Sequence, residues 1–465
     1  MVNRIIQQWS NNYFLIGYLS LVFTLLFQGY NDFIWSYVLP LIEIGIIGYY
    51  YHNEKCIGEF DFIVFMVFGG ILIRIAAVLI MDQILVLYND MPFLSTKDDY
   101  IYNNAAIEIM QRWKNSGWGF YKDLHFSTGY YSGFPNFSAA LMMIFGKSHL
   151  VPRIGNAVIS SLTCVLAYMI IRNYATKTMA RFTGVILTTL PLTIIFSAMQ
   201  LKDTLLLFFI VLALYASVSI ILRKRILLSI AILIISYIGC SVTRAAVIVP
   251  LAVSLLFMIL RSFLSFKPNA NVIINILSLL IIGYILMYVK REFANFDIID
   301  MDYYFESRYH SLTERSFEDS SANIRNMSIA QFLGAPLYLL FGLFLPPPLL
   351  VNIEDVINYS SWCMLAHFSF LPFLGVAMWN SIVKRKDHEI PFFLFLVYLF
   401  LRIGQANSLM TSFSPRQSLG TLFIMYMLLP MYDCEKKTWE KWFLFLSIGV
   451  TFMYNVVRLL SHGML

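Results

Sequence analysis

The chain alternates long apolar runs with short polar segments. A helix needs about 20 mostly apolar residues to cross the hydrocarbon core of a bilayer, and by that criterion the sequence predicts about 13 spans. They are expected at 12–29, 33–51, 61–84, 150–171, 180–199, 203–222, 226–242, 245–264, 271–289, 360–383, 391–408, 416–432 and 439–460. The pattern therefore predicts an all-α, polytopic integral membrane protein with one transmembrane domain, 1–465.

Composition supports this fold class. Hydrophobic residues make up 59% of the 465 positions and charged residues only 13%, against about 25% charged residues in a soluble domain. So few charges cannot cover a surface in water, so most of the surface must face membrane lipids. The net charge of +6 comes from short clusters between apolar runs and does not indicate a nucleic-acid partner. The cysteines lack CxxC spacing, which argues against a disulfide framework or a metal cluster.

Basic residues are concentrated in alternate connections, for example 172–181, 223–225 and 384–386. By the positive-inside rule these connections are cytoplasmic, and so is the N-terminus. The opposite face receives two long segments, 85–149 and 290–359. Abundant Ile, Asn, Tyr and Lys are typical of AT-rich bacterial genomes, so we expect a multi-pass protein of the bacterial cytoplasmic membrane.

Both outer loops have internal structure. Residues 102–114 predict an interfacial amphipathic helix, because apolar and polar side chains separate onto two faces. The apolar face carries Tyr102, Ala105, Ala106, Ile109 and Trp113, and the polar face carries Asn104, Glu108 and Arg112. An apolar piece at 137–145 is too short to span. In the second loop, 328–351 is broken by prolines and predicts a re-entrant or interfacial segment.

Several ionisable residues lie in or beside the spans. Arg74 and Arg402 fall within spans, where pairing inside the bundle or snorkelling to the headgroups is the favoured interpretation. Lys202, Arg244 and Arg416 lie at the outer face. There a guanidinium or ammonium suits a phosphate through charge-assisted hydrogen bonds, and snorkelling to the headgroups or pairing within the bundle is an equally weighted alternative.

Asp98 and Asp99 directly precede the amphipathic helix. Acidic residues at a helix start bond to backbone N–H groups and interact favourably with the helix dipole. A catalytic base with a tuned pKa, or a cation site, is the alternative. The isolated His125 and His310 are interpreted as ordinary loop residues. No cofactor is indicated with certainty; acids of the second loop are interpreted as solvated charge, with a bound divalent cation as the alternative.

Three stretches resemble the GT-C superfamily of membrane glycosyltransferases, which use polyprenyl-phosphate sugars, such as the aminoarabinose and protein O-mannosyl transferases. They are Asp98–Ala106, the aromatic stretch from Tyr130 and Tyr131 through Phe145-Gly146 to the Arg153-led span, and Pro191–Leu206 with its Lys202-Asp203 turn. Three spans precede the acidic loop here, two more than in the family, and the Lys202-Asp203 pairing is a variant.

The resemblance implies roles for particular residues. Asp98 or Asp99 would be the general base, and Asp203 a second acidic site residue. Lys202, Arg244 and Arg416 would hold the donor phosphate, and Tyr102, Tyr130 and Tyr131 would belong to the substrate loop. The partners would be a polyprenyl-phosphate-linked sugar donor, membrane lipids, and a glycan, lipid or protein acceptor.

We therefore expect an inverting glycosyltransferase acting on the outer face of the membrane. A cell-envelope polysaccharide polymerase or ligase, relying on Arg244 and Arg416, is one alternative. A transporter or flippase is another, although the sequence shows no convincing internal repeat of the kind that transporters often carry.

Overall fold

The computed structural model describes residues 58–93, 98–121, 132–244, 247–248, 251–252, 254–256, 359–384, 389–405 and 415–432. These residues form helices and no strand, which confirms the all-α prediction. Several predicted features lie outside the described residues. They are the spans at 12–29, 33–51, 271–289 and 439–460, most of the span at 245–264, the second outer loop with its 328–351 segment, Tyr130, Tyr131, His125 and His310.

Five helical segments within the described residues are long and apolar enough to cross a membrane. They are Glu59–Leu87 in α4 (Glu59–Asn89), α7 (Leu150–Ile171), Lys177–Ala198 formed by α8 (Lys177–Thr189) and α9 (Pro191–Ala198), α10 (Asp203–Ile221) and α11 (Ile226–Arg244). They coincide with the spans predicted at 61–84, 150–171, 180–199, 203–222 and 226–242. The total of about 13 spans stays a prediction.

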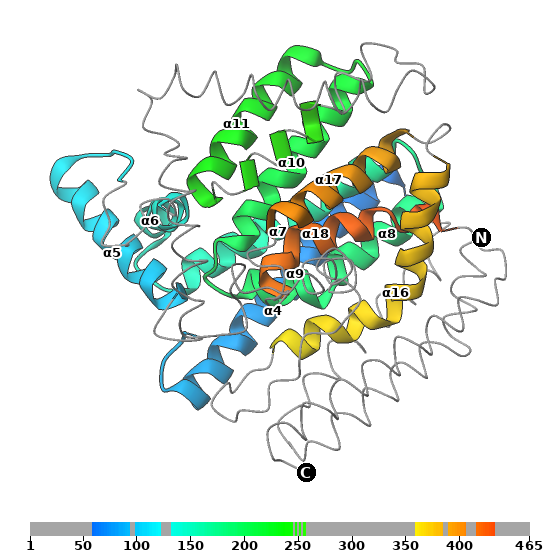
Figure 1. The fold of residues 1–465 in the computed structure, drawn as a ribbon. Helices are drawn as coiled ribbons and strands as arrows, with labels where there is room; N and C mark the ends of the chain where they lie inside the picture. The colour runs from blue at the N-terminus through cyan, green and yellow to red at the C-terminus, as the bar shows by residue number, and fades with distance from the viewer. Residues whose placement is uncertain are drawn as a thin grey trace, which may run out of the picture.

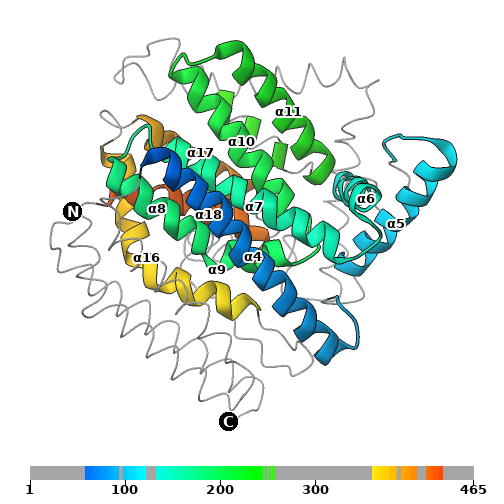
Figure 2. The same ribbon diagram turned by 180° about the vertical axis from the view of Figure 1, so that it is seen from behind.

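The remaining helices are α5 (Asp98–Ser116), α6 (Gly133–Phe145), α16 (Tyr359–Val383), α17 (Glu389–Gln405), α18 (Pro415–Met427) and the short 3-10 helix η6 (Leu429–Met431). Helix α7 lies at the centre and contacts α4, α6, α8, α9 and α10, while α11 lies alongside α10 (Figures 1 and 2). Helices α5 and α6 stand together at one end of the bundle (Figure 1).

The outer helices α4 and α11 expose apolar side chains. Phe68 and Leu72 on α4, and Leu227 and Ile234 on α11, are all more than half exposed. By contrast, the span formed by α8 and α9 is buried throughout. Large exposed apolar surfaces mark contact with lipid or with another protein. Together with the five spans, this identifies a membrane protein.

The span of α8 and α9 is broken at Pro191. Proline has no N–H group, so the carbonyl of Leu187, four residues earlier, loses its helical partner. Side chains replace it: Cys164 Sγ lies 3.2 Å from this oxygen and Thr193 Oγ1 lies 3.2 Å from it. The break is thus satisfied inside the protein, as a polar backbone at membrane depth must be.

Arg74 is fully buried beside this break. Its guanidinium donates to Thr188 O at 3.0 Å, Ser160 Oγ at 2.9 Å and Thr193 Oγ1 at 3.0 Å, and also to Gly70 O at 3.1 Å. These bonds join α4 to α7, α8 and α9. The interpretation that Arg74 is paired inside the bundle is confirmed, and the residue has a structural explanation.

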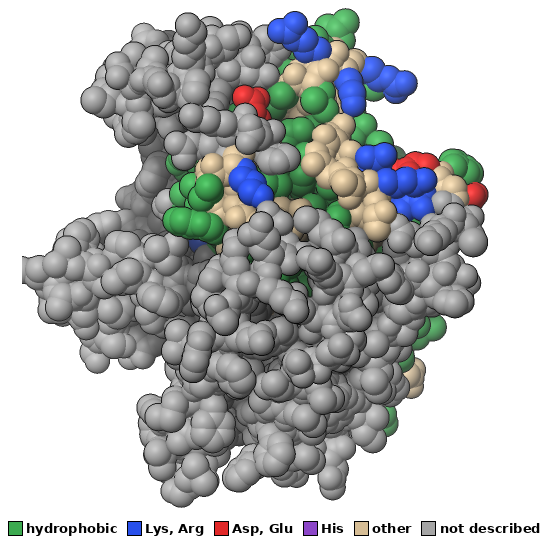
Figure 3. Space-filling model, turned by 90° about the vertical axis from the view of Figure 1, so that its right-hand side faces the viewer, with side chains coloured by type: hydrophobic (Ala, Val, Ile, Leu, Met, Phe, Trp, Pro, Cys, Tyr) green, Lys and Arg blue, Asp and Glu red, His purple; other side chains and the backbone are tan. Residues whose placement is uncertain are grey.

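The end of the bundle away from α5 and α6 carries the basic connections. Figure 3 shows Lys and Arg side chains gathered on this face, with acidic side chains among them. Glu59 is 3.6 Å from Arg172 and 3.4 Å from Arg181, while Lys224 Nζ lies 3.2 Å from Asn173 Oδ1. The last contact places the predicted connections 172–181 and 223–225 at the same end, as alternation of the spans requires. That this end is cytoplasmic stays a prediction.

Helix α5 buries the face that the sequence pattern predicted. Tyr102, Ala105, Ala106, Ile109 and Trp113 are all buried, and the helix packs against α6. The helix begins at Asp98, four residues before the predicted start, and α6 begins at Gly133 rather than at 137. An interfacial position of α5 stays a prediction, because much of its apolar face is covered by α6.

Candidate functional site

The site lies where the start of α5 meets the starts of α7 and α10. Asp98 and Asp99 form the first turn of α5, where carboxylates interact favourably with the helix dipole. Asp99 is 2% exposed, and its Oδ1 accepts a hydrogen bond from Tyr100 N at 3.1 Å. Asp98 is only partly buried. The interpretation of this pair as a helix start is therefore confirmed, and it leaves one carboxylate within reach of solvent.

A fully buried arginine supports this turn. Arg153, on the first turn of α7, donates to Asp82 Oδ1 at 3.0 Å and also to Pro92 O. It interacts electrostatically with Asp99. His149 Nε2 lies 2.8 Å from the same Asp82 oxygen. The carboxylate of Asp82 thus compensates a guanidinium that would otherwise be costly to bury.

Phe93 connects this arginine to α5. Its ring lies 5.7 Å from the Arg153 guanidinium and makes edge contacts with Tyr100 at 5.6 Å and with His149 at 6.0 Å. Because Tyr100 is in the first turn of α5, the position of that turn depends on how Arg153 holds the segment that contains Phe93.

The first turn of α5 also approaches α10. Lys202 Nζ lies 5.8 Å from the centre of the Tyr102 ring, at the distance of a cation–π contact. Tyr102 in turn packs edge-on against Phe134 at 5.5 Å and joins Leu205 in a small apolar cluster. The structure thus brings Tyr102 and Lys202 together, two residues that the resemblance assigned to the site.

Asp203 and Arg244 form an ion pair across α10 and α11. Arg244 Nη1 lies 3.8 Å from Asp203 Oδ1; Asp203 is 4% exposed, and the Arg244 side chain is 19% exposed. Asp203 begins α10 and Arg244 ends α11, so each sits at the helix end whose dipole favours its charge. The pair leaves part of the arginine accessible beside Lys202.

The turn before α10 is fixed by α7. Asn156 Nδ2 donates to Met199 O at 2.9 Å and to Leu201 O at 3.1 Å. Gln200, between them, is fully buried, and its amide has no hydrogen-bond partner among the described residues. The position of Lys202 and Asp203 is therefore set by Asn156, a residue that the sequence interpretation passed over.

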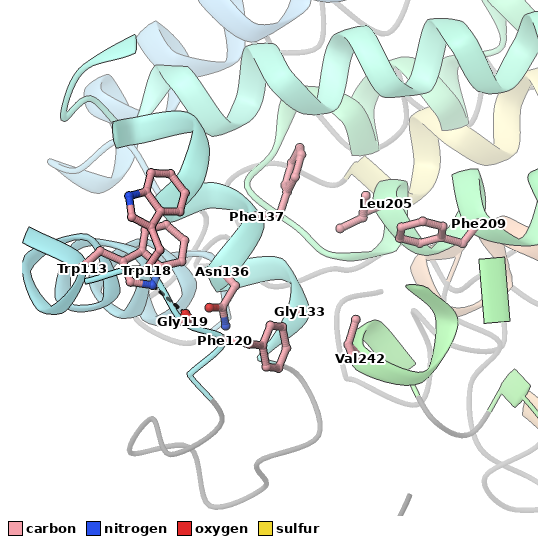
Figure 4. A pocket seen from close by; sticks show the side chains of 10 residues that line it. All are labelled: Trp113, Trp118, Gly119, Phe120, Gly133, Asn136, Phe137, Leu205, Phe209 and Val242. Carbon is pink, nitrogen blue, oxygen red and sulfur yellow. Dashed lines mark hydrogen bonds between the residues drawn. The ribbon is translucent and has the colours of Figure 1, made fainter. Parts of the chain in front are cut away.

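An apolar cavity of about 380 Å³ lies beside the ion pair. Figure 4 shows its lining residues: Trp113, Trp118, Gly119, Phe120, Gly133, Asn136, Phe137, Leu205, Phe209 and Val242. Leu205 is two residues beyond Asp203, and Val242 is two residues before Arg244.

Two polar side chains in this lining, Trp113 and Asn136, are already hydrogen-bonded within the protein. Trp113 Nε1 donates to Gly119 O at 2.6 Å. Asn136 Nδ2 donates to Tyr121 O at 2.9 Å, and its Oδ1 accepts from Tyr121 N at 3.2 Å. The cavity therefore presents an aromatic and aliphatic surface, which suits an apolar ligand.

The structure does not describe the side chains of three other residues that were predicted to belong to the site. Arg416 is the second residue of α18, and its side chain lies outside what the structure describes. Tyr130 and Tyr131 also lie outside the described residues. Within the described part of the chain, no three His, Cys, Asp or Glu side chains gather as a metal site would require. The acids of the second loop, to which the divalent-cation alternative applied, are not described.

Sequence reasoning missed the support formed by Asp82, His149 and Arg153. Two of its members were visible as ionisable residues at predicted span ends, Asp82 closing one span and Arg153 opening another. Their pairing across 71 positions could not be seen, because it depends on how α4 and α7 pack.

Residues 133–288, about a third of the chain, match the model of the family described as dolichyl-phosphate-mannose-protein mannosyltransferase. This confirms the resemblance to GT-C membrane glycosyltransferases, and it implies a membrane glycosyltransferase with a polyprenyl-phosphate-linked sugar donor. The matched region contains Arg153, Lys202, Asp203 and Arg244 and begins after Asp99. No curated protein and no solved structure matches the chain.

Proposed function

We propose that the chain transfers a sugar from a polyprenyl-phosphate carrier to an acceptor hydroxyl on the outer face of a bacterial cytoplasmic membrane. The observation that carries this proposal is that the start of α5, which carries two aspartates, lies against the turn before α10, which carries Lys202. Asp98 and Asp99 begin α5, and Tyr102 on the same helix lies against Lys202, next to the Asp203–Arg244 pair.

Asp98 is the better candidate for the base. A general base must come within hydrogen-bond reach of the proton that it removes. Asp98 is partly exposed, whereas Asp99 is buried and accepts from the backbone. In the proposed step, the Asp98 carboxylate takes the proton of the acceptor hydroxyl as its oxygen bonds to the anomeric carbon of the donor sugar. The bond from that carbon to the phosphate oxygen breaks on the opposite side, so the configuration inverts.

The leaving phosphate needs positive charge nearby. Among the described residues, Lys202 and Arg244 are the cations that we assign to the leaving phosphate. Arg416, whose side chain is not described, is a third candidate that the sequence suggests. Guanidinium groups hold phosphate through paired N–H donors, and ammonium groups hold it as a point charge. The cavity beside Arg244 is apolar and aromatic, in keeping with an isoprenoid segment next to the phosphate.

The test uses the full chain in proteoliposomes, with polyprenyl-phosphate-[³H]mannose as donor probe and detergent-extracted envelope material as acceptor. Transfer is measured as label leaving the organic phase. Asp98→Asn should lower the rate by about 10² to 10⁴, the usual contribution of a general base. Asp61→Asn, which removes an exposed carboxylate near the other end of α4, is the matched control and should keep full activity.

Full activity in Asp98→Asn, in Asp99→Asn and in the double variant would remove the basis for the proposal. Loss of activity on Arg244→Ala and Arg416→Ala, with none at the two aspartates, would favour a polymerase or ligase acting on diphosphate-linked glycans instead.

A further inference from the structure

The buried charges at the start of α7 are not required by the proposed chemistry itself. Arg153 is fully buried, so its guanidinium is out of direct reach of a substrate. Burying an arginine carries a large desolvation cost, even when it is paired. Apart from the ion pair with Asp82 on α4, the contacts described for Arg153 are with the segment that leads into α5 and with the first turn of α5.

We propose that Arg153 is a positioning residue that holds the acidic first turn of α5, with Asp82 and His149 as its supports. This inference rests on the proposed function, because it treats that turn as the location of the base. Three contacts carry it: Arg153 with Asp82 at 3.0 Å, Arg153 with Pro92 O, and the Phe93 ring between Arg153 and Tyr100.

The two terminal nitrogens of the guanidinium, Nη1 and Nη2, bind different parts of the protein. Nη1 is anchored on Asp82, which belongs to α4. Nη2 holds the carbonyl of Pro92, just before the ring that packs on Tyr100. A lysine would carry the same charge, but its single ammonium does not reproduce this planar fork. Charge and geometry can therefore be separated by substitution.

The charge of Arg153 also acts on the carboxylates of the turn. Its interaction with Asp99 is favourable, and a nearby cation stabilises the ionised form of a carboxyl group. Other charged or titratable groups around the turn, among the described residues, are Asp82 on α4, Asp98 on α5, His149 beside α7, and Lys202 and Asp203 at α10. Loss of Arg153 removes a positive charge from beside the acidic turn.

His149 shares the Asp82 oxygen with Arg153, and its side chain is 30% exposed. Through this contact His149 helps to hold the Asp82 carboxylate in the orientation that anchors Arg153. Removing His149 is therefore expected to act in the same direction as removing Arg153, with a smaller effect.

The experiment compares pH–rate profiles of the full chain with the mannose donor probe. Arg153→Gln should move the acid limb to higher pH, because a positive charge beside the turn is lost. Arg153→Lys keeps the charge, so the acid limb should not move. Because the lysine cannot hold both Asp82 and Pro92 O, kcat should fall, while the KM for the donor should be unchanged. Arg181→Gln is the matched control: Arg181 is equally buried and paired with Glu59 at the other end of the bundle, so its loss should lower the melting temperature without moving the limb.

Arg153→Gln leaves the Asp82 carboxylate with His149 but without its guanidinium partner. The double variant Arg153→Gln with Asp82→Asn removes this carboxylate as a cause of misfolding. His149→Phe, at a partly exposed position, is the second safeguard. An unmoved acid limb in all three variants overturns the inference. If Asp98→Asn is inactive while these variants keep the wild-type limb, the proposed function stands and the positioning role fails.

Discussion

Arg244 Nη1 lies 3.8 Å from Asp203 Oδ1, so the arginine nearest the proposed phosphate position already has an acidic partner. Such a pair holds the guanidinium in place but also neutralises part of its charge. The two residues should therefore affect catalysis in different ways.

Arg244→Gln is expected to raise the KM for the polyprenyl-phosphate donor about tenfold, because a charge-assisted hydrogen bond contributes about 1.5–3 kcal/mol. Asp203→Asn is expected to lower kcat without raising KM, since the arginine keeps its charge but loses its alignment. Initial rates over a range of donor concentrations separate the two constants. Arg172→Gln, at the opposite end of the bundle, is the control; an unchanged KM in Arg244→Gln would exclude a phosphate contact.

Trp118 tests whether the cavity takes the lipid segment of the donor. Its indole is 66% exposed and stacks on Trp113 at 4.7 Å. Trp118→Ala removes apolar contacts that would contribute about 1.5 kcal/mol to donor binding. This loss should raise the donor KM about tenfold. A donor with a short prenyl chain should not show this change. Phe145→Ala, an equally exposed site at the far end of α6, is the control. Equal effects on long and short donors would contradict this assignment of the cavity.

Gly133 allows α6 to approach α11 closely. A Cβ added there would lie 2.7 Å from Val242 Cγ2 and 2.7 Å from Val242 O, and the carbonyl cannot move without shifting the helix. Gly133→Ala should therefore destabilise the protein by about 1–3 kcal/mol. Thermal unfolding followed by size-exclusion chromatography measures this. Gly119→Ala, which meets nothing within 4 Å, should unfold like the unmodified protein. A similar melting temperature for both variants would mean that α6 and α11 are not packed this closely.

The sequence predicted those features that depend on local periodicity. The buried face of α5 follows from the spacing of Tyr102, Ile109 and Trp113. The five described spans follow from apolar length. Both signals depend only on residues within one helix, so no knowledge of helix packing is needed.

Features that depend on contacts between helices could be predicted from the sequence only in part. The resemblance assigned Asp203 and Arg244 to one site, and the structure shows the two side chains paired. The Asp82–Arg153 pair, however, joins helices far apart in the sequence, and no spacing rule indicates it. Asn156 likewise bonds to backbone carbonyls of the turn between α9 and α10, and nothing in the sequence distinguishes it from any other polar residue in a span.

Arg74 has a consequence for how the chain enters the membrane. Apart from Gly70, every group that accepts its hydrogen bonds belongs to α7, α8 or α9, as far as 119 positions later in the chain. An unpaired arginine at the centre of a span costs about 2.5–3.5 kcal/mol on insertion scales. During synthesis, the Arg74 side chain therefore lacks these partners, and α4 carries this cost, until the later helices have been made. Assembly of this half of the bundle is then coupled to the completion of α9, the helix that leads into Lys202 and Asp203.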